Sequence, residues 1–292
     1  MPPRDPHAPV LTNSSGATAM VRPVGIRWAI GDVSALGFEA LRLSLWGAHR
    51  LFGPEARLAV CVNTVPLDEA QRRTGPVPDS VEWRAVTAGH MPAALRRYLD
   101  GSMAEGVAWK LAPLRVFPDR YELSLDNDCI LWGLPEAVAA WLAEPKPRCL
   151  IAADAKLAHG AFTHLTRPEP RNTGIRGLPP GFDLEAALLT VLEAHGVPLR
   201  SELDEQGLQV VALDLGREAH VVSTDEVTIC SPFWPHQPHL GRAGAHFVGL
   251  NARALPWRYY ERPATECVVE NWRRHRATLY ERVGLPVPQD GG

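Results

Sequence analysis

Short apolar runs alternate along the chain with stretches in which apolar residues recur every three or four positions. The short runs mostly end at turn-forming residues and predict β-strands at 24–30, 57–62, 81–86, 121–125, 149–152 and 208–213. The periodic stretches predict helices at 34–52, 68–73, 104–117, 135–142, 184–194 and 265–283. Strands and helices in alternation predict an α/β fold with a mixed, mostly parallel sheet flanked by helices.

The chain shows no internal repeat and no linker that would divide it, and its 292 residues suffice for one large α/β domain. We therefore predict a single domain at 23–292. Residues 1–22 are rich in Pro, Ser, Thr and Ala and have no apolar core, so they are predicted to form a disordered leader and not a signal peptide. Two later segments, 166–180 and 231–244, are dense in Pro and Gly and predict irregular loops.

The charge balance argues against a nucleic-acid-binding protein, because a formal net charge of -3 and a pI near 6.4 leave no basic excess. The five cysteines are scattered and never spaced as Cys-x-x-Cys, which favours a reducing compartment. No run of eighteen apolar residues occurs, so no transmembrane segment is predicted, and peripheral contact with a membrane stays open. We predict a soluble cytoplasmic protein, and the bias toward Arg, Ala and Pro favours a GC-rich bacterial genome.

An acidic motif, Asp126-Asn127-Asp128, follows the strand predicted at 121–125. In an extended chain residues i and i+2 point the same way, so Asp126 and Asp128 converge while Asn127 faces elsewhere. Open α/β sheets bind ligands at the carboxyl ends of their strands. Carboxylates alone repel a diphosphate, by roughly 4 kcal/mol for two unit charges about 4 Å apart at an effective dielectric of about 20. A divalent cation reverses that sign, so the motif indicates a metal site for a phosphorylated ligand.

Further polar segments accompany this motif in a defined order: Trp109-Lys110-Leu111, Arg171-Asn172-Thr173-Gly174-Ile175, Asp204-Glu205-Gln206-Gly207-Leu208, and His246-Phe247-Val248-Gly249 followed by Pro256-Trp257. Together they resemble GT-A glycosyltransferases, particularly the retaining family 8 group that includes glycogenin and bacterial lipopolysaccharide galactosyltransferases. The resemblance spans roughly 24–257 and implies a GT-A-like, Rossmann-like fold. It also implies a nucleotide-binding part at 23–132 and an acceptor part at 133–292.

The resemblance implies a metal-dependent, retaining transfer of a sugar from a nucleotide-diphosphate donor, a UDP-sugar, to an unknown glycan, lipid or small-molecule acceptor. Asp126, Asp128 and His246 are expected to bind Mn²⁺ or Mg²⁺, and a histidine nitrogen beside oxygen donors suits Mn²⁺. Residues expected to bind the nucleotide-sugar are Asp32, Lys110, Asp126, Asn127 and Arg253. Residues expected at the reacting sugar are Asn172, Glu205 and Gln206.

Two positions depart from the family pattern. Leu255 stands where the Lys of a Lys-Pro-Trp element is expected, and Arg253 and Arg258 are the nearby cations, either of which could bind a diphosphate bidentately. The family's Asp-Gln pair is Glu205-Gln206 here, which leaves open which side chain lies at the anomeric carbon.

Each of these features also has a simpler interpretation. Asp-Asn-Asp and Asn-Thr-Gly both suit ordinary turns. His236 and His239, with Cys230 upstream, allow a structural zinc site, although no second ligand pair accompanies them. The Arg-rich run 273–276 suits a solvated helix face, or contact with an anionic acceptor or membrane. The tryptophans that could stack on a sugar or pack in the core are Trp234, Trp257 and Trp272.

Two other functions are compatible with the sequence. A nucleotidyltransferase would use similar carboxylates and a cation, but it is expected to have a Gly-rich basic loop after its first strand, and Gly31-Asp32-Val33-Ser34 is not such a loop. A degenerate member of the fold would bind a nucleotide-sugar without turnover, and fold alone does not distinguish these functions.

Overall fold

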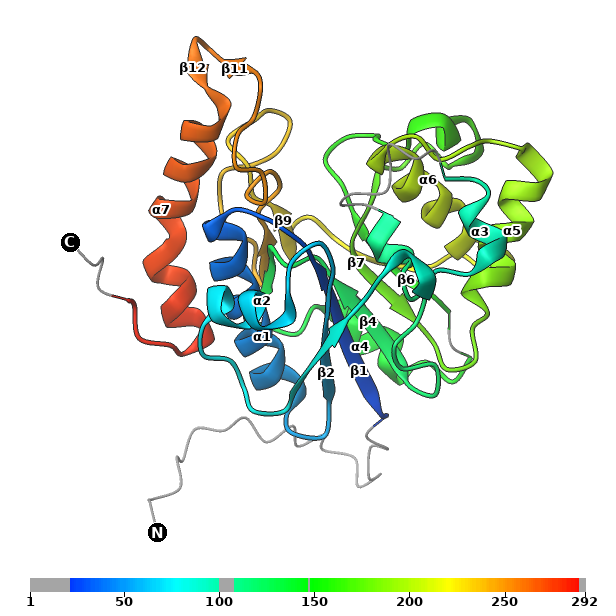
Figure 1. Cartoon of the computed structure of the whole chain (residues 1–292), viewed down its shortest axis with the longest axis horizontal. Helices are drawn as coiled ribbons and strands as arrows, with labels where there is room; N and C mark the ends of the chain where they lie inside the picture. Colours follow the sequence, from blue (N-terminus) through cyan, green and yellow to red (C-terminus); the bar gives the residue numbers. More distant parts are fainter. Residues whose placement is uncertain (1–21, 100–107, 147, 289–292) are drawn as a thin grey trace.

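A seven-stranded mixed sheet in the order β3-β2-β1-β4-β7-β6-β8 forms the centre of the protein (Figure 1). The computed structural model describes residues 22–99, 108–146 and 148–288, so the predicted leader lies outside it except for residue 22. The strands are β1 (Val24–Ile30), β2 (Arg57–Val62), β3 (Val81–Ala85), β4 (Tyr121–Leu125), β6 (Leu150–Ala153), β7 (Arg171–Leu178) and β8 (His220–Val222). Four neighbouring pairs are parallel, and the two pairs that include β7 are antiparallel, which confirms the predicted single α/β domain with a mixed, mostly parallel sheet.

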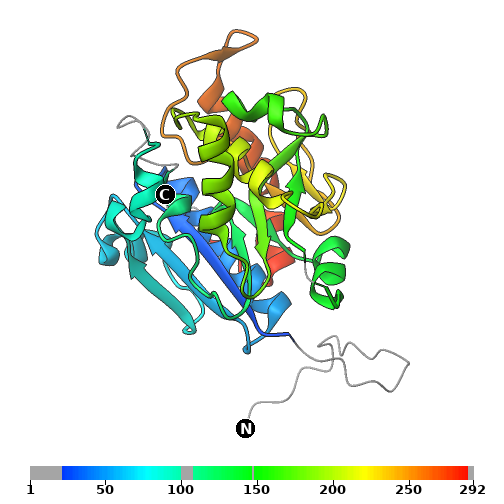
Figure 2. The same cartoon turned by 90° about the vertical axis from the view of Figure 1, so that its right-hand side faces the viewer.

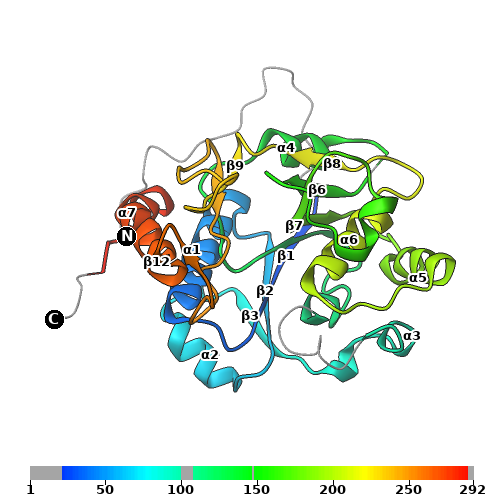
Figure 3. The same cartoon turned by 90° about the horizontal axis from the view of Figure 1, so that it is seen from above.

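Helices cover both faces of this sheet. On one face lie α1 (Ala35–Phe52) and α7 (Ala264–Val283), drawn in blue and red in Figure 1 and Figure 3. On the other face lie α5 (Leu184–His195) and α6 (Glu202–Leu213), which are turned toward the viewer in Figure 2. The shorter helices are α2 (Leu67–Thr74), α3 (Ala93–Arg96), α4 (Glu136–Ala143), η1 (Ala88–His90), η3 (Ala108–Leu111) and η4 (Gly160–Leu165).

Two apolar cores hold these layers together. Phe38 and Leu41 of α1 pack with Trp28 of β1 on one face, and all three side chains are fully buried. On the other face Leu188 of α5 and Leu208 of α6 belong to a second buried cluster. Each such side chain contributes about 1.5–3 kcal/mol relative to an exposed one. Among the residues described, no helix has the length and apolarity that a membrane span requires.

Two small sheets flank the main one. The first has the order β5-β10-β9 and consists of β5 (Cys129–Leu131), β9 (Val227–Ile229) and β10 (Gly244–His246). The second is a hairpin of β11 (Arg258–Tyr259) and β12 (Arg262–Pro263), which lies at the upper left in Figure 1, before α7. The first of these sheets continues directly from β4 and therefore matters for the candidate site.

Helix α1 begins and ends as its sequence predicts. The Ser34 side chain caps it by accepting a hydrogen bond from the Gly37 amide at 3.0 Å, and Gly53 ends it with a φ of 70°. The Ser34 hydroxyl also donates to the Leu250 carbonyl at 2.7 Å. The start of α1 is thus tied to the loop that follows β10.

Three predicted elements are wrong, whereas the other predicted strands and helices agree with the structure to within one residue at each end. The predicted helix at 104–117 is, within the described residues, only the short η3. Pro113 lacks the amide that a helix needs. The buried Arg27 guanidinium instead donates to the carbonyls of Lys110 and Leu114, at 3.0 and 3.2 Å.

The predicted strand at 208–213 is the second half of α6. An apolar run of this length does not distinguish a buried strand from a buried helix. Here the helix begins earlier, at Glu202, and its N-cap Ser201 accepts a side-chain hydrogen bond from the Asp204 amide at 3.2 Å.

The segment predicted to be an irregular loop at 166–180 contains β7, which lies between β4 and β6. Its sequence lacks a continuous apolar run, because Arg176 and two glycines interrupt it. The glycines make room for neighbours: a Cβ at Gly177 would lie 2.9 Å from the Trp141 ring. Asn172-Thr173-Gly174 is therefore part of a strand and not a turn.

Candidate functional site

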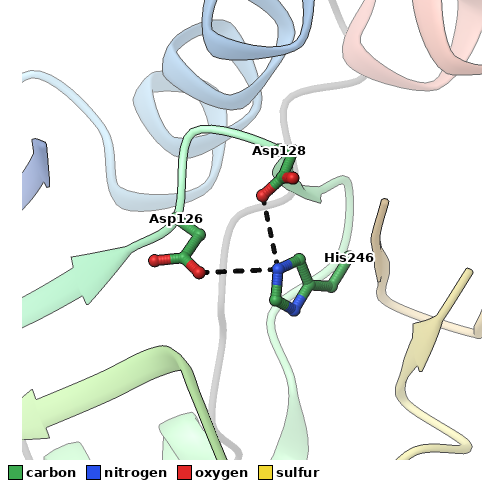
Figure 4. A group of neighbouring side chains, drawn as sticks. All are labelled: Asp126, Asp128 and His246. Atoms are coloured by element: carbon green, nitrogen blue, oxygen red, sulfur yellow. Dashed lines mark ion pairs between the residues drawn. The ribbon is translucent and has the colours of Figure 1, made fainter. Parts of the chain in front are cut away.

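Asp126, Asp128 and His246 meet at the carboxyl end of β4, and both carboxylates point toward the imidazole ring (Figure 4). His246 Nε2 lies 3.6 Å from Asp126 Oδ2 and 3.3 Å from Asp128 Oδ1. The pairing of β10 with β5 brings them together, since it sets His246 opposite Cys129, the residue after Asp128. One ligand atom from each residue lies within 4.8 Å of the other two.

Strand β7 closes the cluster from the other side. The Asp126 amide donates to the Gly174 carbonyl at 2.9 Å. A Cβ at Gly174 would lie 2.4 Å from His246 Cε1, a contact too short to exist without movement of the ring or the strand. Gly174 therefore allows β7 to approach the imidazole closely.

The charge distribution of the cluster suits a cation. Burial disfavours a charged His246, but hydrogen bonding to Asp128 and the charges of Asp128 and Asp126 outweigh burial and raise the pKa of His246. Apart from the contact with His246 Nε2 at 3.3 Å, buried Asp128 Oδ1 has no hydrogen-bond donor among the described residues, so a metal ion would supply the partner that this ligand atom otherwise lacks. Two carboxylates and one imidazole nitrogen fit Mn²⁺ well and Mg²⁺ acceptably.

This group is the one set of three or more His, Cys, Asp or Glu side chains in the described part of the chain that is close enough to share a metal ion. Cys230, His236 and His239 do not form such a set. Buried Cys230 instead lies 3.6 Å from Asn271 Nδ2. A structural zinc site at these three residues therefore has no support in the geometry.

Asn127 points away from the two carboxylates. Its amide nitrogen donates to the Gly37 carbonyl at 3.0 Å and to Asn251 Oδ1 at 2.6 Å. Asn251 in turn donates to Asp128 Oδ2 at 3.2 Å. Asn127 thus anchors the Asp-Asn-Asp turn to the start of α1, and Asn251 orients one of the carboxylates.

Lys110 lies beside the cluster, with Nζ 2.8 Å from Asp126 Oδ1 and 3.0 Å from Oδ2. Its ammonium also reaches Thr173 Oγ1 of β7 at 3.4 Å. Burial disfavours the charged amine, but Asp126 and Glu205 outweigh burial and raise the pKa of Lys110. The side chain therefore carries a positive charge next to the candidate metal ligands.

Asn172 lies on β7, and Gln206 lies on the neighbouring α6. Gln206 Oε1 accepts a hydrogen bond from the Thr173 amide at 3.2 Å, and its Nε2 donates to the Ala158 carbonyl at 2.9 Å. Asn172 Nδ2 donates to Asp154 Oδ2 at 3.1 Å, and its Oδ1 accepts from the Gly174 amide at 2.7 Å. The structure thus brings both predicted residues to the strand that borders the cluster.

Glu205 lies deeper in the protein than Gln206. Its carboxylate accepts a hydrogen bond from Gln209, whose amide oxygen accepts one from the buried Arg176. Burial raises the pKa of Glu205 to about 7, against the charges of Lys110 and Arg176. A carboxyl group with this pKa changes charge near neutrality.

Asp32 and Arg253 form an ion pair after β1, and Arg73 of α2 joins it with Nη1 2.8 Å from Asp32 Oδ1. The hydrogen bond from Arg73 is the main reason why the pKa of Asp32 is lowered. The Asp32 side chain remains 42% exposed, so it is accessible to a ligand. The two residues predicted to bind the nucleotide are therefore brought together.

Sequence reasoning missed several residues of the site. Asp154 follows β6 as Asp126 follows β4, so the strand-end argument could have identified it. Thr173 belongs to a segment that the sequence singled out, but no role was predicted for its side chain. Arg73 and Asn251 carry no comparable signal, because their contacts depend on which segments meet in space. Of the three tryptophans considered, Trp272 is buried in a core, whereas Trp257 and Trp234 are 42% and 83% exposed.

The sheet and the site define the class of fold: the chain has the GT-A fold of glycosyltransferases, as expected from the sequence. A crystal structure of the galactosyltransferase LgtC with donor and acceptor sugar analogs aligns at a TM-score of 0.51 and 15% identity, over 91% of this chain and 98% of LgtC. An active-site mutant of LgtC aligns at 0.51 and 14% identity, over 86% of this chain and 95% of its own.

A bifunctional glycosyltransferase, WbbM, aligns at a TM-score of 0.48 and 14% identity, over 94% of this chain and 53% of its own. This similarity is too low to support the assignment of the fold. No protein-family model matches the chain, and no curated protein sequence matches it either. At such low identity the structural likeness shows the fold alone.

Proposed function

We propose that the protein is a metal-dependent glycosyltransferase that moves a sugar from a UDP-sugar to an acceptor hydroxyl. The observation that carries this proposal is the convergence of Asp126, Asp128 and His246 at the carboxyl end of β4, with the Lys110 ammonium 2.8 Å from Asp126. A cation site beside a fixed positive charge is suited to a diphosphate. The LgtC structure with donor and acceptor sugar analogs shares the fold and supports this class of reaction.

Asp126, Asp128 and His246 would hold the metal ion, with Mn²⁺ favoured over Mg²⁺ because one ligand is an imidazole nitrogen. The raised pKa of His246 and the sparse hydrogen bonding of Asp128 Oδ1 both indicate that the two carboxylates favour a further positive charge beside that of Lys110. When bound, the ion supplies Lewis-acid stabilisation of the negative charge that develops on the departing diphosphate.

Lys110 would contact the diphosphate, since its ammonium is the positive group already placed at Asp126. Asp32 would bind the nucleoside end of the donor, and Asp126 would also lie near the ribose. Arg253, which pairs with Asp32, would bind the diphosphate bidentately. Asn127 contributes by holding the turn, since its side chain faces α1. The donor site therefore draws on the nucleotide-binding part at 23–132 and also on His246 and Arg253 from the acceptor part at 133–292.

Asn172 and Gln206 would face the donor sugar, because both are bonded to the β7 segment that borders the metal ligands. Glu205 would act from behind them, with its buried carboxyl group near Lys110 and Arg176. We propose retention of the anomeric configuration, because Gln206 is an uncharged group and not a carboxylate that would take the proton of the acceptor hydroxyl for an inverting attack.

Turnover of nucleotide-sugars tests the proposal. Release of UDP from UDP-galactose and UDP-glucose would be measured with and without Mn²⁺ for the wild type, for Asp128→Asn, and for the exposed control Asp79→Asn. We expect Mn²⁺-dependent release by the wild type and by the control, and a loss of at least about a hundredfold in Asp128→Asn. Turnover that is unaffected by Asp128→Asn would contradict the assignment, and binding without turnover would indicate a degenerate protein.

A further inference from the structure

Exposed aromatic side chains gather at one place on the surface. Of the aromatic side chains that the structure describes, three are exposed: Trp234, Trp257 and Tyr260, to 83%, 42% and 85%. Trp234 lies in the loop after β9, Trp257 directly precedes β11, and Tyr260 lies at the tip of the β11–β12 hairpin (Figure 1). Aromatic rings normally bury most of their surface, so three exposed rings in one place indicate a binding surface.

Two half-buried rings join the three exposed ones. The ring centroid of Phe233 lies 4.4 Å from that of Trp257 and 5.1 Å from that of Tyr259. The Tyr259 ring in turn lies 4.7 Å from the Tyr260 ring, and the Trp234 amide donates to the Tyr259 hydroxyl at 3.5 Å. These five residues form one aromatic cluster, in which the inner rings support the outer ones.

The hairpin tip holds Tyr260 outward at an energetic cost. Tyr260 and Glu261, which connect the paired strands β11 and β12, both have positive φ angles, of 44° and 65°. Two-residue turns of this kind favour Asn and Gly, because a larger side chain is strained at positive φ. The Tyr260 ring is 85% exposed, so burial in a core does not explain an aromatic residue at this strained position. Contact with a ligand would explain it, since backbone strain of this kind collects at ligand sites.

The aromatic cluster adjoins the candidate metal site. Strand β9 pairs with β10, which carries His246, and the loop after β9 carries Trp234. Trp234 is two residues from His236, so at most about 7 Å separates their Cα atoms. His236 Nε2 lies 3.9 Å from Asp154 Oδ1, and Asp154 accepts a hydrogen bond from Asn172, which is proposed to face the donor sugar. The cluster therefore lies on the side of the site where an acceptor would approach the donor sugar.

The charges around the cluster favour an uncharged ligand. Segment 251–270, which carries most of the cluster, contains three Arg and three Glu and thus has no net charge. The Arg-rich run 273–276 begins about two and a half turns into α7, beyond the hairpin. A surface that binds anionic lipids is expected to have a basic excess. A sugar ring has no charge, and it offers an apolar face to an aromatic ring and hydroxyls to the polar edges of Trp and Tyr.

We propose that the aromatic cluster binds the acceptor, and that the acceptor is a saccharide whose rings stack on Trp234, Trp257 and Tyr260. This inference rests on the proposed function and names the class of acceptor, which the sequence left open. One hydroxyl of the saccharide would reach the donor sugar beside Asn172, while further sugar rings lie on the cluster. The cluster thus selects the acceptor and makes no contact with the departing diphosphate.

The test compares transfer to saccharides with transfer to glycerol, which has hydroxyls but no ring. Wild type, Trp234→Ala and Tyr260→Ala would be assayed with Mn²⁺, UDP-galactose or UDP-glucose, and maltose, cellobiose, lactose or glycerol as acceptor. The control Leu215→Ala shortens an exposed side chain outside the cluster, and Tyr260→Phe keeps the ring. Mn²⁺-dependent binding of UDP to each variant shows that the fold and the donor site are intact.

We expect the wild type to transfer to at least one of the three saccharides. Trp234→Ala and Tyr260→Ala should raise the KM for that saccharide, because they remove acceptor binding. The ratio of its kcat/KM to that of glycerol should fall by about tenfold or more, and it should stay within about threefold of the wild type in Leu215→Ala and Tyr260→Phe.

An unchanged ratio in both Trp234→Ala and Tyr260→Ala would overturn the inference. A wild type that hydrolyses the UDP-sugar but transfers to none of the three saccharides would overturn it as well and would leave the proposed function standing. Binding of the wild type to vesicles of phosphatidylglycerol and phosphatidylethanolamine that is lost in Trp234→Ala, with saccharide transfer unchanged, would identify a membrane contact instead. A wild type that releases UDP from neither donor would overturn the proposed function, and this inference with it.

Discussion

Gly174 and His246 are in direct contact, because the backbone of β7 passes so close to the imidazole that a Cβ at Gly174 would lie 2.4 Å from His246 Cε1. The same Cβ would lie 2.7 Å from Asn172 Oδ1. The Asn-Thr-Gly segment therefore places the polar side chain of Asn172 and the bare backbone of Gly174 next to His246, one of the three candidate metal ligands.

Gly174→Ala should displace His246 and weaken metal binding. We expect the Kd for Mn²⁺ to rise by about tenfold or more, since loss of correct ligand orientation typically costs 10–100-fold in affinity. Titration with Mn²⁺, followed by its effect on water proton relaxation, measures this directly. Gly89→Ala is the control, because a Cβ there meets nothing closer than 3.4 Å. Unchanged Mn²⁺ affinity in Gly174→Ala would show that His246 is not a ligand.

Lys110→Met should weaken UDP binding in the presence of Mn²⁺. A charged group that hydrogen-bonds an anion contributes about 1.5–3 kcal/mol, so the Kd for UDP should rise by roughly tenfold or more. Lys146→Met, which removes an exposed lysine, is the matched control. Isothermal titration of both variants with UDP, at fixed Mn²⁺, provides the comparison. Equal affinities in the two variants would exclude a phosphate contact for Lys110.

Glu205→Gln should change how stability depends on pH. Burial raises the pKa of Glu205 from 4.5 to about 7, so between these values the folded protein keeps a proton that the unfolded chain has lost. The stability that this group contributes is fully present below pH 4.5 and is lost as the pH rises through about 7. The loss amounts to about 3 kcal/mol.

Gln at position 205 has no proton to lose, so the variant should become more stable relative to the wild type as the pH rises from 5 to 8. The difference in the free energy of unfolding should grow by up to about 3 kcal/mol across that range. Urea unfolding at several pH values measures it. A constant difference between the two proteins would mean that Glu205 is ionised at all of these pH values.

Strand and helix positions follow from the sequence wherever one pattern dominates, as in β1, β4 and α1, whose apolar residues occur at the spacing of the observed element. Strand β7 could not be found this way, because Gly174 and Gly177 replace side chains that would otherwise mark a buried strand. Glycine is needed at these two positions because His246 and Trp141 approach the backbone closely, and this approach exists only in the folded chain.

The residues of the candidate site likewise divide into those that the sequence identifies and those that only the folded chain brings together. Asp126 and Asp128 are visible in sequence because their chemistry and their strand are adjacent in the chain. Asp154 had a similar signal, whereas the connection from Asp154 through Asn172 to Gly174 depends on the pairing of β6 with β7. Pairings between distant segments of the chain are set by tertiary packing, which local patterns do not encode.

The central claim is that Asp126, Asp128 and His246 hold a metal ion that binds a nucleotide diphosphate. The thermal unfolding midpoint of the wild type and of Asp128→Asn, with UDP or GDP and with or without Mn²⁺, tests it most directly. Ligand at a hundredfold excess over Kd adds about 2.7 kcal/mol to the stability of the folded state. We predict that UDP raises the midpoint of the wild type only when Mn²⁺ is present, and that Asp128→Asn shows no such shift. A shift by UDP that is equal with and without Mn²⁺, or no shift with either nucleotide, would contradict the account.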